Sequence, residues 1–427
     1  MSTPSLLNVP YRLKAGTLYS QIPETGLGDF VVTRSASNVA TRINSLGFIE
    51  TVADNVPRLD YPLGGAVNGC PALLVEPSAQ NLCLQSQTLD VSATWVPESG
   101  TLVSPNSTAT LSPDGLNTAE IVTLVSGGAN QLYQAIAMAS GTTYTASIFL
   151  KNIALTSGQT FFFSTANQDA TINQVNCTID LANATITSAV VGVGVTVSNV
   201  ALDNYGNGWY RARFTFSFAV GNAAARLRLR QNSSVGYNTA FYVWGAQFET
   251  GSVATSYIRT TTQAITRGAD VIRKTSITSL IGQSEGAVYF EVEVTDEARN
   301  KWFCTLDSAS NSFIQMWVNP TRQINAQINN SGTIVVSPLA SSVLAIGYHK
   351  VAFAYNTATN GCIMYVDGVQ NPATTRTVGS PGLPAFNDMR FGGYIAGTTE
   401  SIKGHVRAGA VYPNRLSNSE LAALTTP

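Results

Sequence analysis

Two glutamates, Glu291 and Glu293, have the spacing of a catalytic carboxylate pair. On a β-strand they share one face, about 7 Å apart at Cα, which suits a retaining glycoside hydrolase. The alternative is a strand whose apolar residues, Val292 and Val294, face the core while the carboxylates lie in water. We expect the second arrangement and keep polysaccharide hydrolysis as an alternative.

Catalysis by a histidine has little support in the sequence. The chain contains two histidines, His349 and His405, and each lies in a run typical of a strand. A catalytic triad needs a histidine held beside a nucleophile and oriented by a third group, and we expect both residues to be structural. The sequence therefore predicts a protein that is not an enzyme.

The sequence gives similarly little support for a metal site or for thiol chemistry. Five cysteines are widely spaced and form no Cys-x-x-Cys pair, which argues against a zinc site or a disulfide framework. Oxygen-bearing residues near turns, such as Asp203 and Asp367, are explained by turn formation. Glu249 follows an apolar strand, and we retain it as a candidate ligand for one structural calcium. No other cofactor is expected.

Aromatic side chains near turns or in polar runs could stack on sugar rings. The candidates for glycan binding are Trp95, Tyr133, Tyr205, Tyr237 and Trp317. The alternative for each is an anchor in the core of a β-sandwich or in an interface. Trp209 and Trp244 are flanked by apolar alternation, and we expect both in the core.

Three arginines alternate with apolar residues, so a strand would place Arg226, Arg228 and Arg230 on one face. They could contact acidic sugars. We favour the alternatives, which are a solvated sheet face or pairing with carboxylates of a neighbouring subunit.

Composition restricts the classes of partner. Of 427 residues, 24 are Lys or Arg and 25 are Asp or Glu, and charged residues make up 11%, against about 25% in typical proteins. A hydrophobic content of 44% excludes global disorder. The absence of a basic excess argues against nucleic-acid binding. A polar surface of low charge suits a neutral glycan.

The sequence shows no export or membrane signal. The first residues lack a basic region followed by an apolar run, so we expect no secretory signal. No stretch of 18 apolar residues occurs, and we expect no insertion into a membrane.

Strand signals dominate the chain. Runs such as 144–150 and 211–218 alternate apolar and polar residues. Turn pairs such as Asn207-Gly208 and Asp367-Gly368 separate apolar runs, as in antiparallel hairpins. Ser417 and Glu420 form a capping box that predicts one short terminal helix. The predicted fold is all-β, with tandem β-sandwiches (jelly rolls) after an extended, loop-rich N-terminal segment.

The chain divides into four predicted regions: an attachment or assembly segment (1–80), a sandwich (81–262), a linker (263–281) and a second sandwich (282–427). The first region is rich in proline and too irregular to bury its apolar residues alone. We expect neighbouring copies of the chain to cover them, and the residues concerned are Leu6, Leu7, Val9, Leu18, Phe30, Val31, Val32, Phe48 and Ile49.

The N-terminal part contains the runs Asn55-Val56-Pro57-Arg58-Leu59-Asp60-Tyr61 and Cys70-Pro71-Ala72-Leu73-Leu74-Val75-Glu76-Pro77. These runs resemble a module of modular bacteriophage virion proteins, such as fibres, tailspikes and capsid appendages, which precedes a jelly roll of the carbohydrate-binding-module type. The run Val243-Trp244-Gly245-Ala246-Gln247-Phe248-Glu249 is similar to the tail of that jelly roll. The last region resembles a concanavalin A-like (laminin-G-like) domain through Gly347-Tyr348-His349-Lys350-Val351-Ala352-Phe353 and Met364-Tyr365-Val366-Asp367-Gly368.

This resemblance implies a fibre or appendage subunit in the virion, in the tail or the capsid. It implies a homotrimer that contacts other virion proteins and attaches to host cell-surface glycans. Two alternatives remain open, namely a tailspike-type polysaccharide hydrolase and a decoration protein without a ligand. Both folds host lectins, enzymes and structural modules, so the function has to be argued from the residues of the site and not from the fold.

Overall fold

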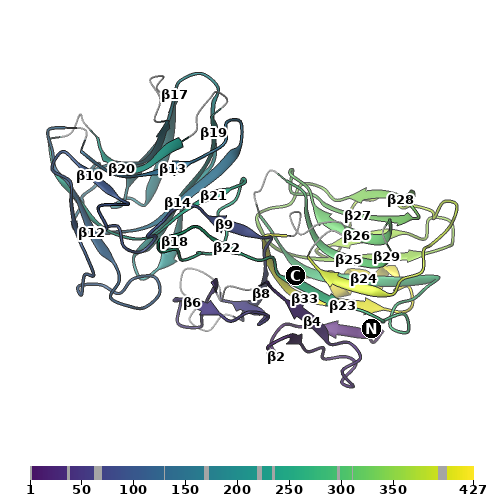
Figure 1. Cartoon of the computed structure of the whole chain (residues 1–427). Coiled ribbons are helices and arrows are strands. Elements are labelled where there is room, and N and C mark those ends of the chain that lie inside the picture. Colours follow the sequence, from purple (N-terminus) through teal and green to yellow (C-terminus); the bar gives the residue numbers. More distant parts are fainter. Residues whose placement is uncertain are drawn as a thin grey trace.

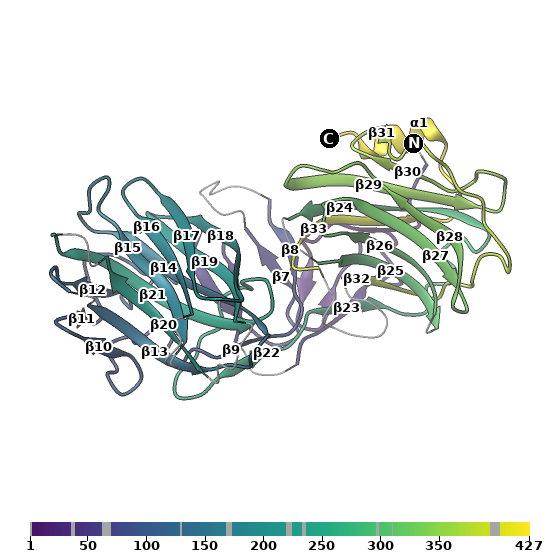
Figure 2. The ribbon, with the colours of Figure 1, turned by 90° about the horizontal axis from the view of Figure 1, so that it is seen from above.

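Two β-sandwiches stand side by side, joined by strands from the N-terminal part of the chain (Figures 1 and 2). The computed structural model describes residues 2–35, 39–61, 70–128, 130–167, 173–218, 224–232, 236–295, 299–309, 311–392 and 402–427. The all-β prediction is confirmed, since the described residues form strands throughout and one short helix.

The first sandwich packs two six-stranded antiparallel sheets. One sheet has the order β10 (Val96–Glu98), β13 (Gln131–Ala137), β20 (Ala224–Gln231), β15 (Phe161–Asn167), β16 (Gln174–Asp180) and β17 (Thr185–Val191). The other has the order β11 (Leu102–Ser104), β12 (Glu120–Leu124), β21 (Thr239–Thr250), β14 (Thr143–Asn152), β19 (Trp209–Phe218) and β18 (Val195–Gly206).

Period-two alternation builds the core of this sandwich. Phe214, Phe216 and Phe218 all point inward from β19 and are fully buried. The opposing sheet supplies Leu227 and Leu229 from β20. Burial of large side chains on one face of each sheet supplies the main stabilisation, at roughly 25 cal/mol per Å² of apolar surface. The turn predicted between β18 and β19 is present, with both Asn207 and Gly208 at positive φ.

The second sandwich packs a larger pair of sheets. One has the order β31 (Val369–Gln370), β30 (Ile363–Val366), β29 (Gly347–Asn356), β24 (Glu285–Val294), β33 (Gly404–Tyr412), β8 (Ala72–Val75) and β7 (Arg58–Asp60), with β1 (Leu6–Asn8) also paired to β33. The other has the order β2 (Leu13–Lys14), β3 (Thr17–Leu18), β4 (Phe30–Thr33), β23 (Val271–Lys274), β32 (Asp388–Phe391), β25 (Lys301–Ala309), β26 (Ser312–Val318), β27 (Ile324–Asn330) and β28 (Thr333–Ala340).

The N-terminal segment is therefore part of the second sandwich. Leu6, Leu18, Phe30 and Val32 are at most 1% exposed and lie in the same core as β24 and β29. This corrects the expectation that neighbouring copies bury them: the chain itself supplies the partner strands. Val9 and Val31 remain exposed. The predicted linker likewise contributes strands, namely β22 (Ile265–Arg267) and β23.

Short pairs of strands fill the junction between the sandwiches. β5 (Ala40–Ile43) pairs with β6 (Ile49–Val52), and β9 (Ala79–Asn81) pairs with β22. The helix α1 (Asn418–Thr425) packs against β29 and β30 of the second sandwich. Ser2 bonds to Glu420 of this helix, so both ends of the chain meet beside α1 (Figure 2).

A buried ion cluster holds the junction. Arg58 from β7 pairs with Glu76 at 2.9 Å and also with Asp270. Arg34 pairs with Asp270 at 2.9 Å, and Arg267 with Glu76 at 3.3 Å. All five side chains are at most 2% exposed. Burial alone would raise the pKa of Glu76, but Arg267 and Arg58 outweigh it and hold that pKa well below its usual value.

Candidate functional site

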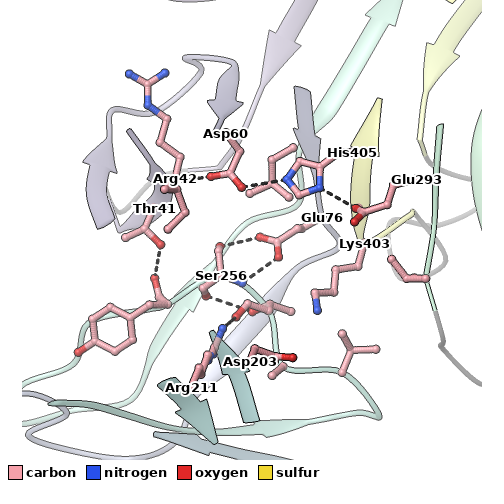
Figure 3. A pocket seen from close by; sticks show the side chains of 18 of the residues that line it. Thr41, Arg42, Asp60, Glu76, Asp203, Arg211, Ser256, Glu293, Lys403 and His405 are labelled. Carbon is pink, nitrogen blue, oxygen red and sulfur yellow. Dashed lines mark hydrogen bonds and ion pairs between the residues drawn. The ribbon is translucent and has the colours of Figure 1, made fainter. Parts of the chain in front are cut away.

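A cavity of about 560 Å³ lies where the two sandwiches and the N-terminal strands meet (Figure 3). Three parts of the chain line it: residues of β5–β8, the end of the first sandwich, and β24 with the start of β33 in the second. A site of this kind exists only when all three parts are folded together. Its volume suits a small ligand such as a sugar unit.

One wall carries a histidine between two carboxylates. His405 contacts Glu293 Oε2 through Nδ1 at 2.7 Å and Asp60 Oδ2 through Nε2 at 2.9 Å (Figure 3). Asp60 also accepts a hydrogen bond from the backbone N–H of Ile43. In the sheet, β33 lies between β24 and β8, and β7 pairs with β8. This strand order brings Glu293, His405 and Asp60 together.

The two carboxylates keep His405 protonated. Burial alone would lower its pKa, but the hydrogen bonds to Asp60 and Glu293 and their charges raise the pKa to about 10. Burial would raise the pKa of Glu293, yet His405 reverses this and lowers it. At neutral pH the group is an imidazolium between two carboxylates, and such a ring cannot accept a proton as a general base.

The opposite wall belongs to the first sandwich. Arg213 pairs with Asp203 at 2.7 Å. Arg211 is buried, donates to the carbonyl of Thr255 at 2.7 Å, and lies over the ring of Phe149. Tyr205 also stands edge-on to Phe149, with ring centroids 4.8 Å apart. Strands β18 and β19 fix these side chains by their register.

The base of the cavity is tied to the buried ion cluster. Glu76 accepts hydrogen bonds from the backbone N–H of Ser256 at 2.8 Å and from its hydroxyl at 2.6 Å (Figure 3). Ser256 belongs to the first sandwich, whereas Glu76 directly follows β8 of the second. The same residues that fix the position of the two sandwiches therefore also shape the cavity.

The arrangement is suited to binding more than to acid–base chemistry. Glu293 is paired with His405, and Glu291 is paired with Arg407 at 3.3 Å. The second histidine, His349, contacts Asp367 and the carbonyl of Ala345. The uncharged polar and aromatic groups that remain around the cavity are those of Thr41, Tyr61, Asn199, Tyr205, Ser252, Thr295 and Tyr348.

The segment Gly282–Gly286 fits the pattern Gly-x-Ser-x-Gly, which a serine hydrolase uses to present its nucleophile. Ser284 lies in the turn directly before β24, not between a strand and a helix. Both ring nitrogens of each histidine already contact other groups. Ser284 therefore lacks both the strand-to-helix turn and the free histidine nitrogen that a serine nucleophile of this type requires.

Of the five predicted glycan-binding aromatics, Tyr205 lines the cavity. Trp95 is 1% exposed in the core of the first sandwich and offers no free ring face, which corrects that expectation. Tyr237 is half-buried, and its hydroxyl is bonded to the backbone of Thr160 and Gly158. Trp317 is also half-buried and stacks on Trp302 with ring centroids 6.2 Å apart.

Tyr133, the fifth candidate, lies on the outer face of the first sandwich beneath the guanidinium group of Arg226. The structure thus scatters the five aromatics over both sandwiches instead of gathering them at one site. Trp209 and Trp244 are buried, as predicted.

The calcium candidate Glu249 is buried, and both its oxygens accept hydrogen bonds from Thr255, from its backbone N–H at 3.0 Å and from its hydroxyl. Burial raises the pKa of Glu249. Within the described part of the chain, no group of three His, Cys, Asp or Glu side chains is arranged to hold a metal ion. Glu249 therefore has a structural partner that accounts for its position.

Asp60, His405 and Lys403 shape this site, yet the sequence did not single them out as a group. Each lies far from the others along the chain, with 345 positions between Asp60 and His405. A signal was present in His405 itself, because a histidine within a strand needs a hydrogen-bond partner when its ring is covered. Its partner could be found only from the strand order.

No family model and no curated protein matches the chain. Solved structures similar to part of it include the CBM40 module of the Ruminococcus gnavus IT-sialidase bound to α2,3-sialyllactose, at 10% identity and a TM-score of 0.29 over 36% of this chain and 91% of that one. Another is the NanB sialidase of Streptococcus pneumoniae, at 14% identity and 0.30, over 35% of this chain and 26% of that one.

A third is a heptameric SAP-like pentraxin from Limulus polyphemus, at 14% identity and a TM-score of 0.27 over 32% of this chain and 68% of that one. Structural similarity at these TM-scores does not support assigning the ligands or activities of those proteins to this chain. In the described residues, no helix is both long and apolar enough to cross a membrane.

Proposed function

We propose that this protein is a non-catalytic glycan-binding subunit that attaches a bacteriophage virion to its host. The virion role rests on the sequence resemblance of the N-terminal region and of the jelly roll that follows it. The binding role rests on one observation: the carboxylates and the histidine at the cavity are held in ion pairs, while tyrosine rings and neutral polar side chains make up other parts of its lining. Sugar recognition uses such groups, with aromatic faces beside hydrogen-bonding side chains.

Tyr61 provides a test of this role. It lines the cavity from the position directly after β7 and packs, like Tyr205, against the buried cluster that contains Phe149. We expect the full chain to bind at least one neutral oligosaccharide on a glycan array, and Tyr61→Ala to weaken that binding about tenfold, in line with the loss of a stacking ring. Tyr11→Ala removes an exposed tyrosine of the same segment away from the cavity and is the matched control.

Two results would reject the proposal. An absence of binding to neutral and acidic glycans alike would favour a decoration protein without a ligand. Release of reducing ends from host polysaccharide that is lost in the double variant Glu291→Gln, Glu293→Gln would establish a hydrolase instead. The outcome expected here is that neither wild type nor the double variant releases reducing ends.

A further inference from the structure

A row of three arginines crosses the outer face of the first sandwich. Arg226, Arg228 and Arg230 point outward from β20, which lies between β13 and β15 in the sheet. The register places Arg228 beside Tyr133 on one side and Ser164 on the other. The sequence alternation that predicted this shared face is confirmed by the burial of Leu227 and Leu229 on the opposite side.

Aromatic rings and neutral polar groups hold the row in place. The guanidinium carbon of Arg226 lies 4.3 Å from the ring centroid of Tyr133, and that of Arg230 lies 4.9 Å from Phe162. Arg228 is 8% exposed and donates to Ser164 Oγ and to Gln174 Oε1, both at 2.9 Å. These contacts orient the three cations through groups that carry no charge.

Carboxylates are scarce around the row. Among the described residues, the one ion pair these arginines form joins Arg226 to Glu98, at 3.8 Å. Burial, together with the charges of Arg230 and Arg226, lowers the pKa of Arg228 to about 10. Three aligned cations therefore repel one another, and a bound anion would relieve this repulsion. A merely solvated face would not need its central arginine buried.

The surroundings of the row favour an anion that also carries hydroxyl groups. Gln174, Asn176 and Thr178 are half-buried on the same face, on the strand beyond β15. Asn176 Oδ1 has no hydrogen-bond partner within the described chain. Guanidinium groups bind carboxylates through paired hydrogen bonds, and amides and hydroxyls suit the hydroxyl groups of a sugar.

We propose that this face binds the carboxylate-bearing sugars of an acidic polysaccharide, with Arg226, Arg228 and Arg230 as the anion-binding row. The inference rests on the proposed glycan-binding function and adds a second surface, separate from the cavity between the sandwiches. Neutral polar side chains next to the row distinguish this ligand from a bare inorganic anion. The low overall charge of the protein, −1, means that attraction arises from this local row.

The experiment measures binding of the full chain to polysialic acid and to polygalacturonate oligomers, with neutral dextran oligomers and duplex DNA as comparisons. We expect the acidic oligomers to bind, and binding to weaken as salt concentration rises. The triple variant Arg226→Gln, Arg228→Gln, Arg230→Gln should lose at least tenfold in affinity for them. The control replaces three exposed cations, Arg12, Lys14 and Arg259, by Gln, which changes net charge equally.

Each result separates the two proposals. Equal binding of acidic oligomers to wild type and to the arginine triple variant would overturn the assignment of this face. Binding of inorganic phosphate or of DNA as tightly as the acidic oligomers would overturn the class of ligand. If wild type binds neutral sugars in a Tyr61-dependent way and no acidic sugar, the second site fails while the proposed function stands. Melting temperatures of both triple variants show whether the sheet remains folded.

Discussion

His405 links three strands of the second sandwich through one charged ring. Its partners, Asp60 on β7 and Glu293 on β24, lie far from it and from each other in the sequence. A buried pair that loses one partner leaves an uncompensated charge, which is costly. At the scale of single residues, this ring is the point at which the cavity responds to pH.

The stability of the protein should depend on pH through His405. Its folded pKa of about 10 exceeds the value of about 6.5 for the unfolded chain. Its contribution is therefore fully present below pH 6.5 and is lost as pH rises toward 10. Urea unfolding should show the free energy of unfolding falling across this range, by about 1–3 kcal/mol attributable to His405.

The variant His405→Gln isolates this contribution. It should be less stable than wild type near pH 6, and the difference should shrink toward pH 10. His349→Gln alters the other histidine and should leave the slope due to His405 in place. Parallel curves for wild type and His405→Gln across this range would contradict the assignment. On the acid side, the lowered pKa of Glu293 stabilises the protein above about pH 4.5 and this stabilisation is lost at lower pH.

Residue types alone predicted much of the core but little of the site. The aromatic alternation of β19 identified buried side chains, because burial follows period two within one strand. The partners of His405 could not be predicted, since they depend on which strands become neighbours. Trp95 was misjudged for a related reason: a tryptophan in a polar run can still be covered by a distant sheet.

Helix α1 illustrates an element that local chemistry determines. The Ser417 side chain accepts from the backbone N–H of Glu420, and the Glu420 side chain accepts from the backbone N–H of Ser417. This is the capping box predicted from the sequence. An eight-residue helix is too short to persist alone, and Leu421, fully buried, packs it against the sheet.

Removal of the cap should loosen this element selectively. Ser417→Ala is expected to lower the free energy of unfolding by about 1 kcal/mol, and hydrogen exchange at the first turn of α1 should accelerate. Glu420→Gln is the conservative control, because an amide oxygen still completes the box. Equal protection of α1 in wild type and Ser417→Ala would show that tertiary packing alone holds the helix.

The strands near the N-terminus were harder to predict than α1. β1, β2, β3 and β7 are two or three residues long and lie among prolines, so no window shows a clear alternation. β1 pairs with the long strand β33, and β7 pairs with β8, which itself pairs with β33. β2 pairs with β3, and β3 pairs with β4. Their existence is a property of the completed sheets.

At the scale of the whole molecule, the two sandwiches differ in whether one continuous stretch of sequence forms them. Strands β10–β21 of the first sandwich are contiguous in sequence, and their core is a separate cluster. The second sandwich needs strands from 6–75 and from 271–412 together. The limits of the first sandwich could be predicted, because its strands are contiguous in sequence. The predicted boundary at residue 282 instead separates the second sandwich from N-terminal strands that belong to its sheets.

A fragment of residues 282–427 should therefore fail to fold. It lacks β1, β7 and β8 of one sheet and β2–β4 and β23 of the other, which exposes the core around Phe290 and Phe391. We expect aggregation, or a broad thermal transition in circular dichroism. Residues 81–262 expressed alone are the comparison and should melt cooperatively. A sharp, reversible transition of the 282–427 fragment would show that its ten strands suffice.

The pairing of β1 with β33 also has a consequence for synthesis on the ribosome. The first sandwich can close soon after its last strand emerges, but Leu6 waits for Val411, and Ser2 for Glu420, 418 positions later. During translation the early strands stay unpaired while the middle of the chain already folds, and open strand edges invite association with other chains. Nascent chains of this protein should accordingly depend on chaperones until translation of the C-terminal strands is complete.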